Sequence, residues 1–240
     1  MIKLEKKESI YLLSMDAEEN RWNTAFVREI AEALDEIEND EGPGALITSS
    51  TNPKFFSNGL DLDWMQAPED HPEGGDREVF GEEFMYLMGR FITLPIPTVC
   101  AINGHSFGAG FMFALSHDVR IMREDRGFLC ANEMQLGLPI PRPELALFKH
   151  KIPANAFFET VQLSKRWTGS DALKAGIIQE VSSFEELPEV ALIKAQELAP
   201  LANNRKNFGH QKEMLYGENA AINLNHGPAH MLKNSRDFKV

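Results

Sequence analysis

The chain has 240 residues, of which 43% are hydrophobic and 25% are charged, and its formal net charge is -12. This length is enough for a full hydrophobic core, and we expect one main domain with a small C-terminal addition. The acidic excess disfavours nucleic acid and anionic membrane surfaces as partners, because both are bound by basic surfaces.

Cysteine use and the absence of targeting signals predict a cytoplasmic protein. Cys100 and Cys130 lie in apolar, strand-like runs, so we expect buried thiols in a reducing compartment. The first residues lack the apolar stretch of a signal peptide, and no window approaches the roughly 18 apolar residues of a membrane span. The last residues do not form a peroxisomal tail of the Ser-Lys-Leu type.

The first forty residues predict a hairpin followed by a helix. Residues 2–6 and 9–15 alternate as strands do and are separated by a short polar turn. Asn23 or Thr24 is expected to cap a helix whose apolar residues recur with a period of 3.6. We expect that helix to end near Asp40, before a Gly-Pro-Gly break.

The next segments predict a strand, a loop and a second helix. Residues 45–48 form an apolar run that predicts a buried parallel strand. Residues 54–62 are expected to form a loop that turns into a short helix. Residues 65–77 are rich in Pro, Gly and acidic residues and predict a mobile surface loop. A helix is then expected at 79–92.

The middle of the chain contains a strand that opens into a helix through small residues. Residues 98–102 predict a buried strand, and residues 103–118 combine a glycine-containing turn with an apolar helical run. A helix start presents free backbone N–H groups, which can stabilise negative charge. Residues 119–122 and 128–130 predict further short strands.

The last third is predicted to be mainly helical. The expected helices are residues 144–150, 154–163, 171–175, 185–201 with an interruption at Pro188, and 205–216. Gly176 is expected to close the third of these in the left-handed conformation.

Three segments share the pattern of a strand followed by a glycine-marked turn, namely residues 56–61, 103–110 and 132–139. Together with the Thr-Gly to Gly-Ile-Ile segment at 168–178, their order and spacing resemble the crotonase superfamily of enoyl-CoA hydratases and isomerases. The resemblance implies an α/β crotonase fold, with repeated strand-strand-helix units in two roughly perpendicular sheets. It also implies a core domain at residues 1–183 and a C-terminal helical trimerisation part at 184–240.

The resemblance implies an oxyanion hole made by two backbone N–H groups, those of Leu60 and Ala109. The α-proton of a thioester is acidic enough to remove only if the developing enolate is stabilised. Removing one such donor raises the activation barrier by about 3 kcal/mol. The residues implied to bind the acyl-CoA substrate are Ser57, Asn58, Gly59, Asp61, Phe107, Gly108, Met112, Leu136 and Pro139.

Two positions distinguish hydration from isomerisation. Hydratases of this family use two Glu residues; the first of these positions is Met112 here, and the second is Glu133. A thioether cannot act as a base, but one carboxylate can move a proton from C2 to C4 of a 3-enoyl thioester. The segment from Asn132 to Gly137 resembles that of Δ3,Δ2-enoyl-CoA isomerases. We therefore expect isomerisation by Glu133 in an apolar pocket lined by Met112, Leu136 and Phe107.

The alternatives are enoyl-CoA hydration or acyl-CoA thioester hydrolysis on the same fold, and a non-catalytic member that binds acyl-CoA. We expect no metal and no cofactor besides the coenzyme A of the substrate, since the histidines show no metal-ligand spacing. His105 is expected to be a hydrogen-bonded structural residue, and Asp61 to cap a short helix.

The groups that bind the CoA phosphates are not evident from the sequence. Hydratases often place a Lys where this chain has Asp63, and the candidates left are Lys54, Lys233 and Lys239. The family resemblance implies a homotrimer or a dimer of trimers.

Overall fold

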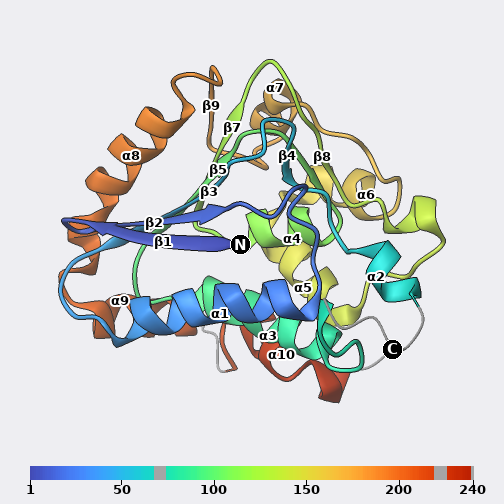
Figure 1. The fold of residues 1–240 in the computed structure, drawn as a ribbon, viewed down its shortest axis with the longest axis horizontal. Coiled ribbons are helices and arrows are strands. Elements are labelled where there is room, and N and C mark those ends of the chain that lie inside the picture. The colour runs from blue at the N-terminus through green and yellow to red at the C-terminus, as the bar shows by residue number, and fades with distance from the viewer. Residues whose placement is uncertain (68–73, 219–225, 239–240) are drawn as a thin grey trace.

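Two sheets organise the protein (Figure 1). The computed structural model describes residues 1–67, 74–218 and 226–238. The larger sheet has the strand order β1 (Ile2–Lys7), β2 (Ile10–Met15), β3 (Ala45–Ser50), β5 (Thr98–Ile102), β7 (Val119–Arg123) and β9 (Glu180–Ser182). The smaller sheet has the order β4 (Phe55–Ser57), β6 (His105–Phe107) and β8 (Leu129–Cys130).

The larger sheet begins with the predicted hairpin and continues with parallel strands. β1 and β2 are antiparallel, with Ile2 opposite Met15, and Glu8 in the connecting turn has a φ of 55°. β2, β3, β5, β7 and β9 then pair in parallel. Parallel strands need crossover connections, and the helices between them supply these. β9 was not predicted, because its three residues carry no alternating pattern.

The helices of the described residues surround these sheets. They are α1 (Thr24–Asn39), α2 (Leu62–Gln66), α3 (Phe80–Thr93), α4 (Ala109–Leu115), η2 (Glu133–Leu136), α5 (Arg142–Lys151), α6 (Ala154–Val161), α7 (Gly169–Lys174), α8 (Leu187–Leu198), η3 (Ala199–Ala202), α9 (Arg205–Tyr216), α10 (Pro228–Lys233) and η4 (Ser235–Phe238). In the described part of the chain, every helix is too short or too polar to span a bilayer.

Most predicted boundaries agree with the structure to within about two residues, and two predictions need correction. Asn23 caps α1 by accepting a bond from the Phe26 N–H, and Gly176 has a φ of 74°. Pro188 does not interrupt α8 but lies in its first turn, where its missing N–H costs nothing. The segment predicted as a loop at 54–62 contains strand β4, which pairs with β6. Part of the predicted loop at 65–77 lies outside the described residues.

The two faces of the larger sheet are covered by different helices. Alternate residues such as Ile47 and Val99 pack against Ala191 of α8. Their neighbours Leu46 and Cys100 face the opposite side, toward the main core that includes α1, α3 and α4. Figure 1 shows α8 and α1 on opposite sides of the strands. The helices after residue 183 therefore pack on the core, and α10 lies against α3 and α5.

A buried ion pair ties α9 to the edge of the main core. The Asp118 carboxylate accepts bonds from the Thr98 N–H and from Lys212 Nζ, the latter at 2.7 Å. Burial alone would raise the pKa of Asp118, but the charges of Lys212 and Lys151 lower it below its usual value. Asp118 is thus a structural residue.

We predict that Lys212→Met destabilises the fold by about 3 kcal/mol, because it leaves the Asp118 carboxylate buried without its closest cation. Urea unfolding monitored by circular dichroism measures the change. Lys206→Met is the matched control, since Lys206 is an exposed lysine of the same helix. Equal stability of the two variants would contradict a stabilising role for the pair.

Candidate active site

Two glycine-marked turns meet at the ends of β4 and β6. Gly59 has a φ of 83°, and a Cβ on it would lie 2.8 Å from the Phe107 carbonyl oxygen and 3.8 Å from the Ala109 nitrogen. Only glycine accepts both this backbone conformation and this close approach. Gly110 is similarly confined, because its Cβ would lie 2.7 Å from Ser57. The turn that carries Leu60 is therefore held directly against the start of α4.

Among the described residues, no backbone acceptor outside helices and strands is bonded to the N–H of Leu60 or of Ala109. Bonds beside Leu60 run from the Trp22 N–H to the Gly59 carbonyl and from the Asp61 N–H to the Trp22 carbonyl. The N–H of Leu60 itself takes no part in this bridge. Ala109 is the first residue of α4, and a first-turn N–H has no acceptor within its helix. Both residues line the same cavity.

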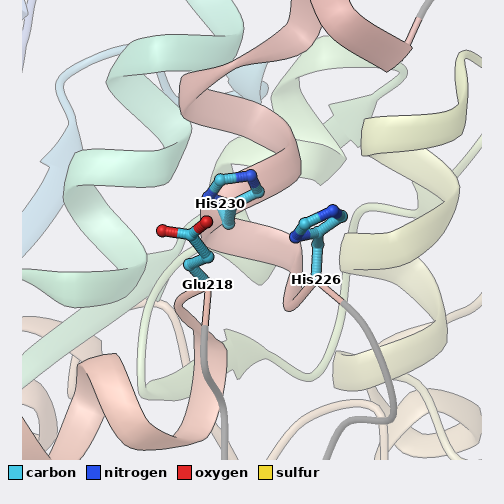
Figure 2. Close-up of side chains that lie close together, drawn as sticks. All are labelled: Glu218, His226 and His230. Atoms are coloured by element: carbon cyan, nitrogen blue, oxygen red, sulfur yellow. The ribbon is translucent and has the colours of Figure 1, made fainter.

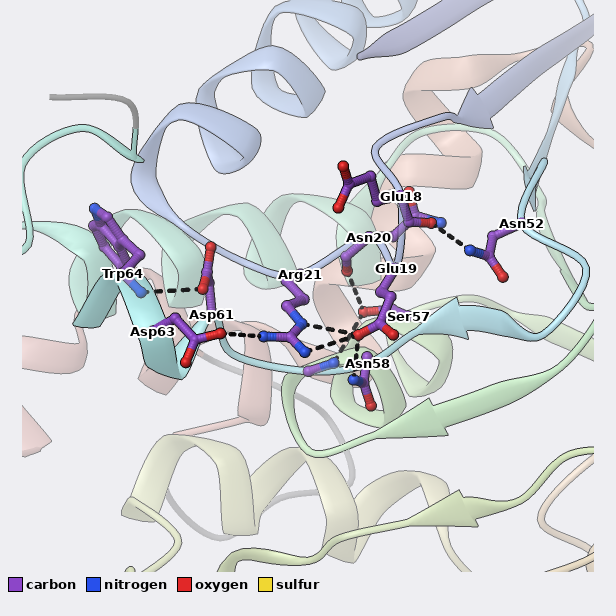
Figure 3. A network of polar contacts seen from close by, with 11 residues as sticks. Glu18, Glu19, Asn20, Arg21, Asn52, Ser57, Asn58, Asp61, Asp63 and Trp64 are labelled. Atoms are coloured by element: carbon purple, nitrogen blue, oxygen red, sulfur yellow. Dashed lines mark hydrogen bonds and ion pairs between the residues drawn. The ribbon is translucent and has the colours of Figure 1, made fainter. Parts of the chain in front are cut away.

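Hydrogen bonds from the segment before α1 hold the first turn in place (Figure 3). Asn20 donates to the Phe56 carbonyl, and the Ser57 hydroxyl donates to the Asn20 carbonyl at 2.7 Å. The Trp22 indole donates to the Ser57 Oγ at 3.0 Å. Asn58 donates to Glu19. This buried network fixes the direction in which Leu60 presents its N–H.

Glu133 lies next to the second turn, beside Gly108. It is the first residue of η2, and a Cβ on Gly108 would lie only 3.2 Å from Glu133 Oε1. Gly108 has a φ of 48°, so it serves as the hinge between β6 and α4 and also leaves space for the carboxylate. The Glu133 carboxylate therefore lies beside the residue that precedes Ala109.

The Glu133 carboxyl is buried and incompletely bonded. Its Oε2 atom has no hydrogen-bond partner in the described part of the chain. Burial raises the pKa of Glu133 above its ordinary value, because the charged form loses water. A carboxylate in this state is a stronger base than an exposed one.

A cavity of about 280 Å³ joins these groups. Besides Leu60, Ala109 and Glu133, it is lined by Asn58, Gly59, Leu62, Phe80, Phe84, Gly108, Asn132, Leu136, Leu138, Pro139, Pro141 and Glu144. Most of these side chains are apolar. An apolar wall with a few polar groups is the usual composition of a small-molecule site.

Five of the nine predicted substrate-binding residues line this cavity, namely Asn58, Gly59, Gly108, Leu136 and Pro139. The other four lie elsewhere. Ser57 is buried under the first turn, and Asp61 caps α2 through the Trp64 N–H, as predicted. Phe107 stacks on His105, and Met112 is 1% exposed within the main core. The expected pocket wall of Met112, Leu136 and Phe107 is therefore wrong except for Leu136.

Glu144 is a cavity residue that the sequence interpretation missed. It lies in the first turn of α5, where acidic residues are common, so it was predicted only as part of a helix. In the structure it lines the same cavity as Glu133, and burial together with the Glu133 charge raises the pKa of Glu144 to about 8. No sequence spacing marks this approach of two carboxyl groups.

Comparisons with known proteins identify the family of the chain. The family model of enoyl-CoA hydratase/isomerase matches residues 5–226. The chain belongs to the enoyl-CoA hydratase/isomerase family. It is 31% identical over 222 residues to enoyl-CoA delta isomerase 3 of Arabidopsis thaliana, with 91% of this chain and 93% of the relative covered. The prediction of the crotonase superfamily is thus confirmed.

Solved structures of the family confirm the fold. Human mitochondrial delta3-delta2-enoyl-CoA isomerase has a TM-score of 0.81 at 26% identity and covers 98% of this chain and 87% of its own. A probable enoyl-CoA hydratase from Mycobacterium tuberculosis has a TM-score of 0.82 at 26% identity, with 98% and 92% covered. The chain is therefore an enzyme-family member with the predicted crotonase fold.

The histidines differ in part from the sequence prediction. His105 lies among Phe55, Phe107 and Phe128, but its buried Nδ1 has no partner in the described residues, so it is not the hydrogen-bonded residue expected. Burial lowers the pKa of His105, and nearby cations including Lys54 lower it further. Packing rather than proton transfer explains this residue.

Two other histidines gather with a glutamate between α9 and α10 (Figure 2). The ligand atoms of Glu218, His226 and His230 lie within 4.8 Å of one another. The two imidazole rings are stacked, with centroids 4.4 Å apart and planes at 21°. A metal binds imidazole nitrogen in the ring plane, so stacked rings do not direct their lone pairs to one point. This arrangement would need a ring rotation before it could hold an ion.

The cations proposed for the CoA phosphates have different surroundings. Lys233 Nζ donates to Thr93 and pairs with Glu213, whereas Lys54 lies over the Phe55 ring. Lys239 lies outside the described residues. Asp63, where hydratases often have Lys, is paired with Arg21 at 2.9 Å, so a cation does lie next to this position (Figure 3).

We predict that Ala109→Pro lowers turnover of the enoyl-CoA substrate by about 100- to 1000-fold. Proline is tolerated in the first turn of a helix but has no N–H, so the change removes one donor at the junction. Steady-state kinetics with circular dichroism measures activity and folding together. Ala109→Gly keeps the N–H and is the control. A folded Ala109→Pro enzyme with the control's turnover would contradict an oxyanion role for this group.

Proposed function

We propose that this protein isomerises 3-enoyl-CoA to trans-2-enoyl-CoA. Glu133 removes the proton from C2, and the N–H groups of Leu60 and Ala109 hold the thioester oxygen as it gains negative charge. The observation that carries the proposal is the Glu133 carboxylate, whose buried Oε2 is unpartnered in the described residues and whose Oε1 occupies space that a Cβ at residue 108 would crowd. A base in an apolar pocket beside two free N–H donors fits enolate formation.

The identity of residue 112 favours isomerisation over hydration. Met112 occupies the position of the first hydratase Glu and is buried in the core, so it offers neither a carboxylate nor access to the cavity. The relatives of the chain include enoyl-CoA delta isomerases, among them the peroxisomal isomerase 2 of Arabidopsis thaliana at 32% identity. That name describes the relative and supports, by similarity, the same substrate class here.

Hydration of 2-enoyl-CoA is the second candidate function. It is favoured by the presence of Glu144 in the cavity, because two carboxyl groups can together activate and deliver water. Incubation with crotonyl-CoA separates the two reactions, since hydration removes the absorbance of the conjugated thioester. Isomerase activity alone leaves that absorbance unchanged.

We further propose that the protein needs no metal and no cofactor besides the coenzyme A of its substrate, and that it assembles as a homotrimer or a dimer of trimers. The C-terminal part carries exposed apolar side chains that suit contacts between copies, among them Leu192, Ile193 and Leu201.

Glu133→Gln is predicted to lower isomerisation of a 3-enoyl-CoA by at least about 100-fold, because the amide cannot accept the C2 proton. The appearance of conjugated thioester absorbance measures the rate. Glu124→Gln, at an exposed position, is the control and should retain wild-type turnover. Near-normal isomerisation by Glu133→Gln would remove that carboxylate from the mechanism.

As the pH is lowered, we predict that the turnover number begins to fall at a higher pH than it would if the base were an exposed glutamate. Burial raises the pKa of Glu133, and its protonated form is no longer a base. A profile of turnover against pH at saturating substrate gives the apparent pKa. A profile that stays flat down to about pH 4.3, the ordinary value for Glu, would be inconsistent with the buried base.

A further inference from the structure

Two carboxyl groups, from separate segments, share the cavity that holds the oxyanion donors. Glu133 begins η2, and Glu144 lies in the first turn of α5. Both line the cavity, together with Pro139 and Pro141 from the segment that joins them. The rigid prolines fix the path of the chain between the two glutamates.

The position of Glu144 is electrostatically unfavourable for its ionised form, and packing alone does not explain this position. A first-turn carboxylate stabilises a helix when it is ionised. Exposed Glu189, in the first turn of α8, shows this arrangement. Glu144 instead faces the cavity, where burial and the Glu133 charge both oppose its ionisation. Buried, mutually repelling carboxyl groups of this kind concentrate at functional sites.

We propose that Glu144 is a second catalytic acid, which delivers its proton to C4 of the dienolate after Glu133 has taken the proton from C2. The inference rests on the proposed isomerase function. It goes beyond the single-base mechanism, in which one carboxyl group must reach both carbons.

The proton transfers balance as follows. The C2–H bond breaks, its proton passes to Glu133, and its electron pair enters the dienolate held at the thioester oxygen. The Glu144 O–H bond then breaks, its proton forms the C4–H bond, and the double bond lies between C2 and C3. Glu133 is now protonated and Glu144 ionised. Glu133 then releases its proton to solvent and Glu144 takes one proton from solvent, which restores the starting state.

The protonation states required by this sequence agree with the electrostatics of the pair. Two carboxyl groups that line one apolar cavity oppose each other's ionisation, so a state in which one is protonated and the other is charged is favoured over a state in which both are charged. Among the described residues, Glu133 is the charged group that acts on Glu144, and the pKa of Glu144 is raised to about 8. The raised pKa of Glu144 favours its protonated form near neutral pH, so the proposal assigns Glu144 as the acid and Glu133 as the base.

The decisive experiment compares wild type, Glu144→Gln and Glu189→Gln in 3-enoyl-CoA isomerisation across pH 6 to about 9.5. Glu144→Gln is expected to lose about 100-fold in turnover and to lack the fall in rate that the wild type shows above about pH 8. Glu189→Gln, the first-turn control, is expected to match the wild type. A Glu144→Gln enzyme with wild-type turnover and the same fall at high pH would overturn the proposal.

Thermal unfolding separates catalysis from folding. A glutamate whose pKa is raised by folding stabilises the protein below its unfolded pKa, and this contribution is lost as pH rises through the folded pKa. The neutral Gln does not suffer this loss, so the Tm of Glu144→Gln at pH 8 should equal or exceed that of wild type while activity falls. A loss of activity accompanied by a lower Tm would assign Glu144 to the fold and overturn the proposal.

An isotope label gives an independent readout. With substrate deuterated at C2 in ordinary water, the two-acid sequence predicts no deuterium at C4 of the product, because that hydrogen comes from Glu144. Deuterium carried from C2 to C4 would restore the single-base mechanism and overturn the role of Glu144, with the isomerase function intact. Absence of isomerisation by the wild type would overturn both.

Discussion

The close packing at Gly59 and Gly108, against backbone at the first and against side chains at the second, is the constraint on which the site depends. A three-stranded parallel sheet brings β4, β6 and β8 side by side, so that three segments far apart in the sequence end at one place. At Gly59 there is no room for a Cβ against the Phe107 carbonyl, and at Gly108 a Cβ would crowd Glu133. The two N–H donors are thus positioned by backbone packing, and the absence of a Cβ at Gly108 leaves space for the Glu133 carboxylate beside them.

The carboxylates inside the protein have two opposite electrostatic environments. Asp118 is paired with Lys212, and its pKa is lowered, which suits a permanent charge that fastens α9 to the core. In the part of the chain that the structure describes, no cation lowers the pKa of Glu133 or Glu144, and both pKa values are raised. Burial without a counter-charge destabilises the ionised form, and it makes proton transfer near neutral pH feasible. The contrast separates a structural from a reactive use of the same chemical group.

The sequence was sufficient for the fold class and for the principal groups of the site, because both rest on local patterns. Ordered glycine-marked turns predicted the positions of Leu60, Ala109 and Glu133, which the structure brings to one cavity. Short strands such as β4 were missed, since three residues carry too little periodicity. Met112 was placed in the pocket wall, but its position along α4 turns it into the core. Glu144 could not be found from spacing, as its approach to Glu133 depends on how α5 packs.

The central claim is that the cavity converts a 3-enoyl thioester into its conjugated isomer, and product analysis tests it most directly. Purified protein is incubated with trans-3-hexenoyl-CoA, the products are separated by chromatography, and their masses are measured by mass spectrometry. The account predicts trans-2-hexenoyl-CoA of unchanged mass, with conjugated thioester absorbance appearing as the substrate is consumed. A product heavier by one water, or release of free coenzyme A, without accumulation of the conjugated isomer, would contradict it.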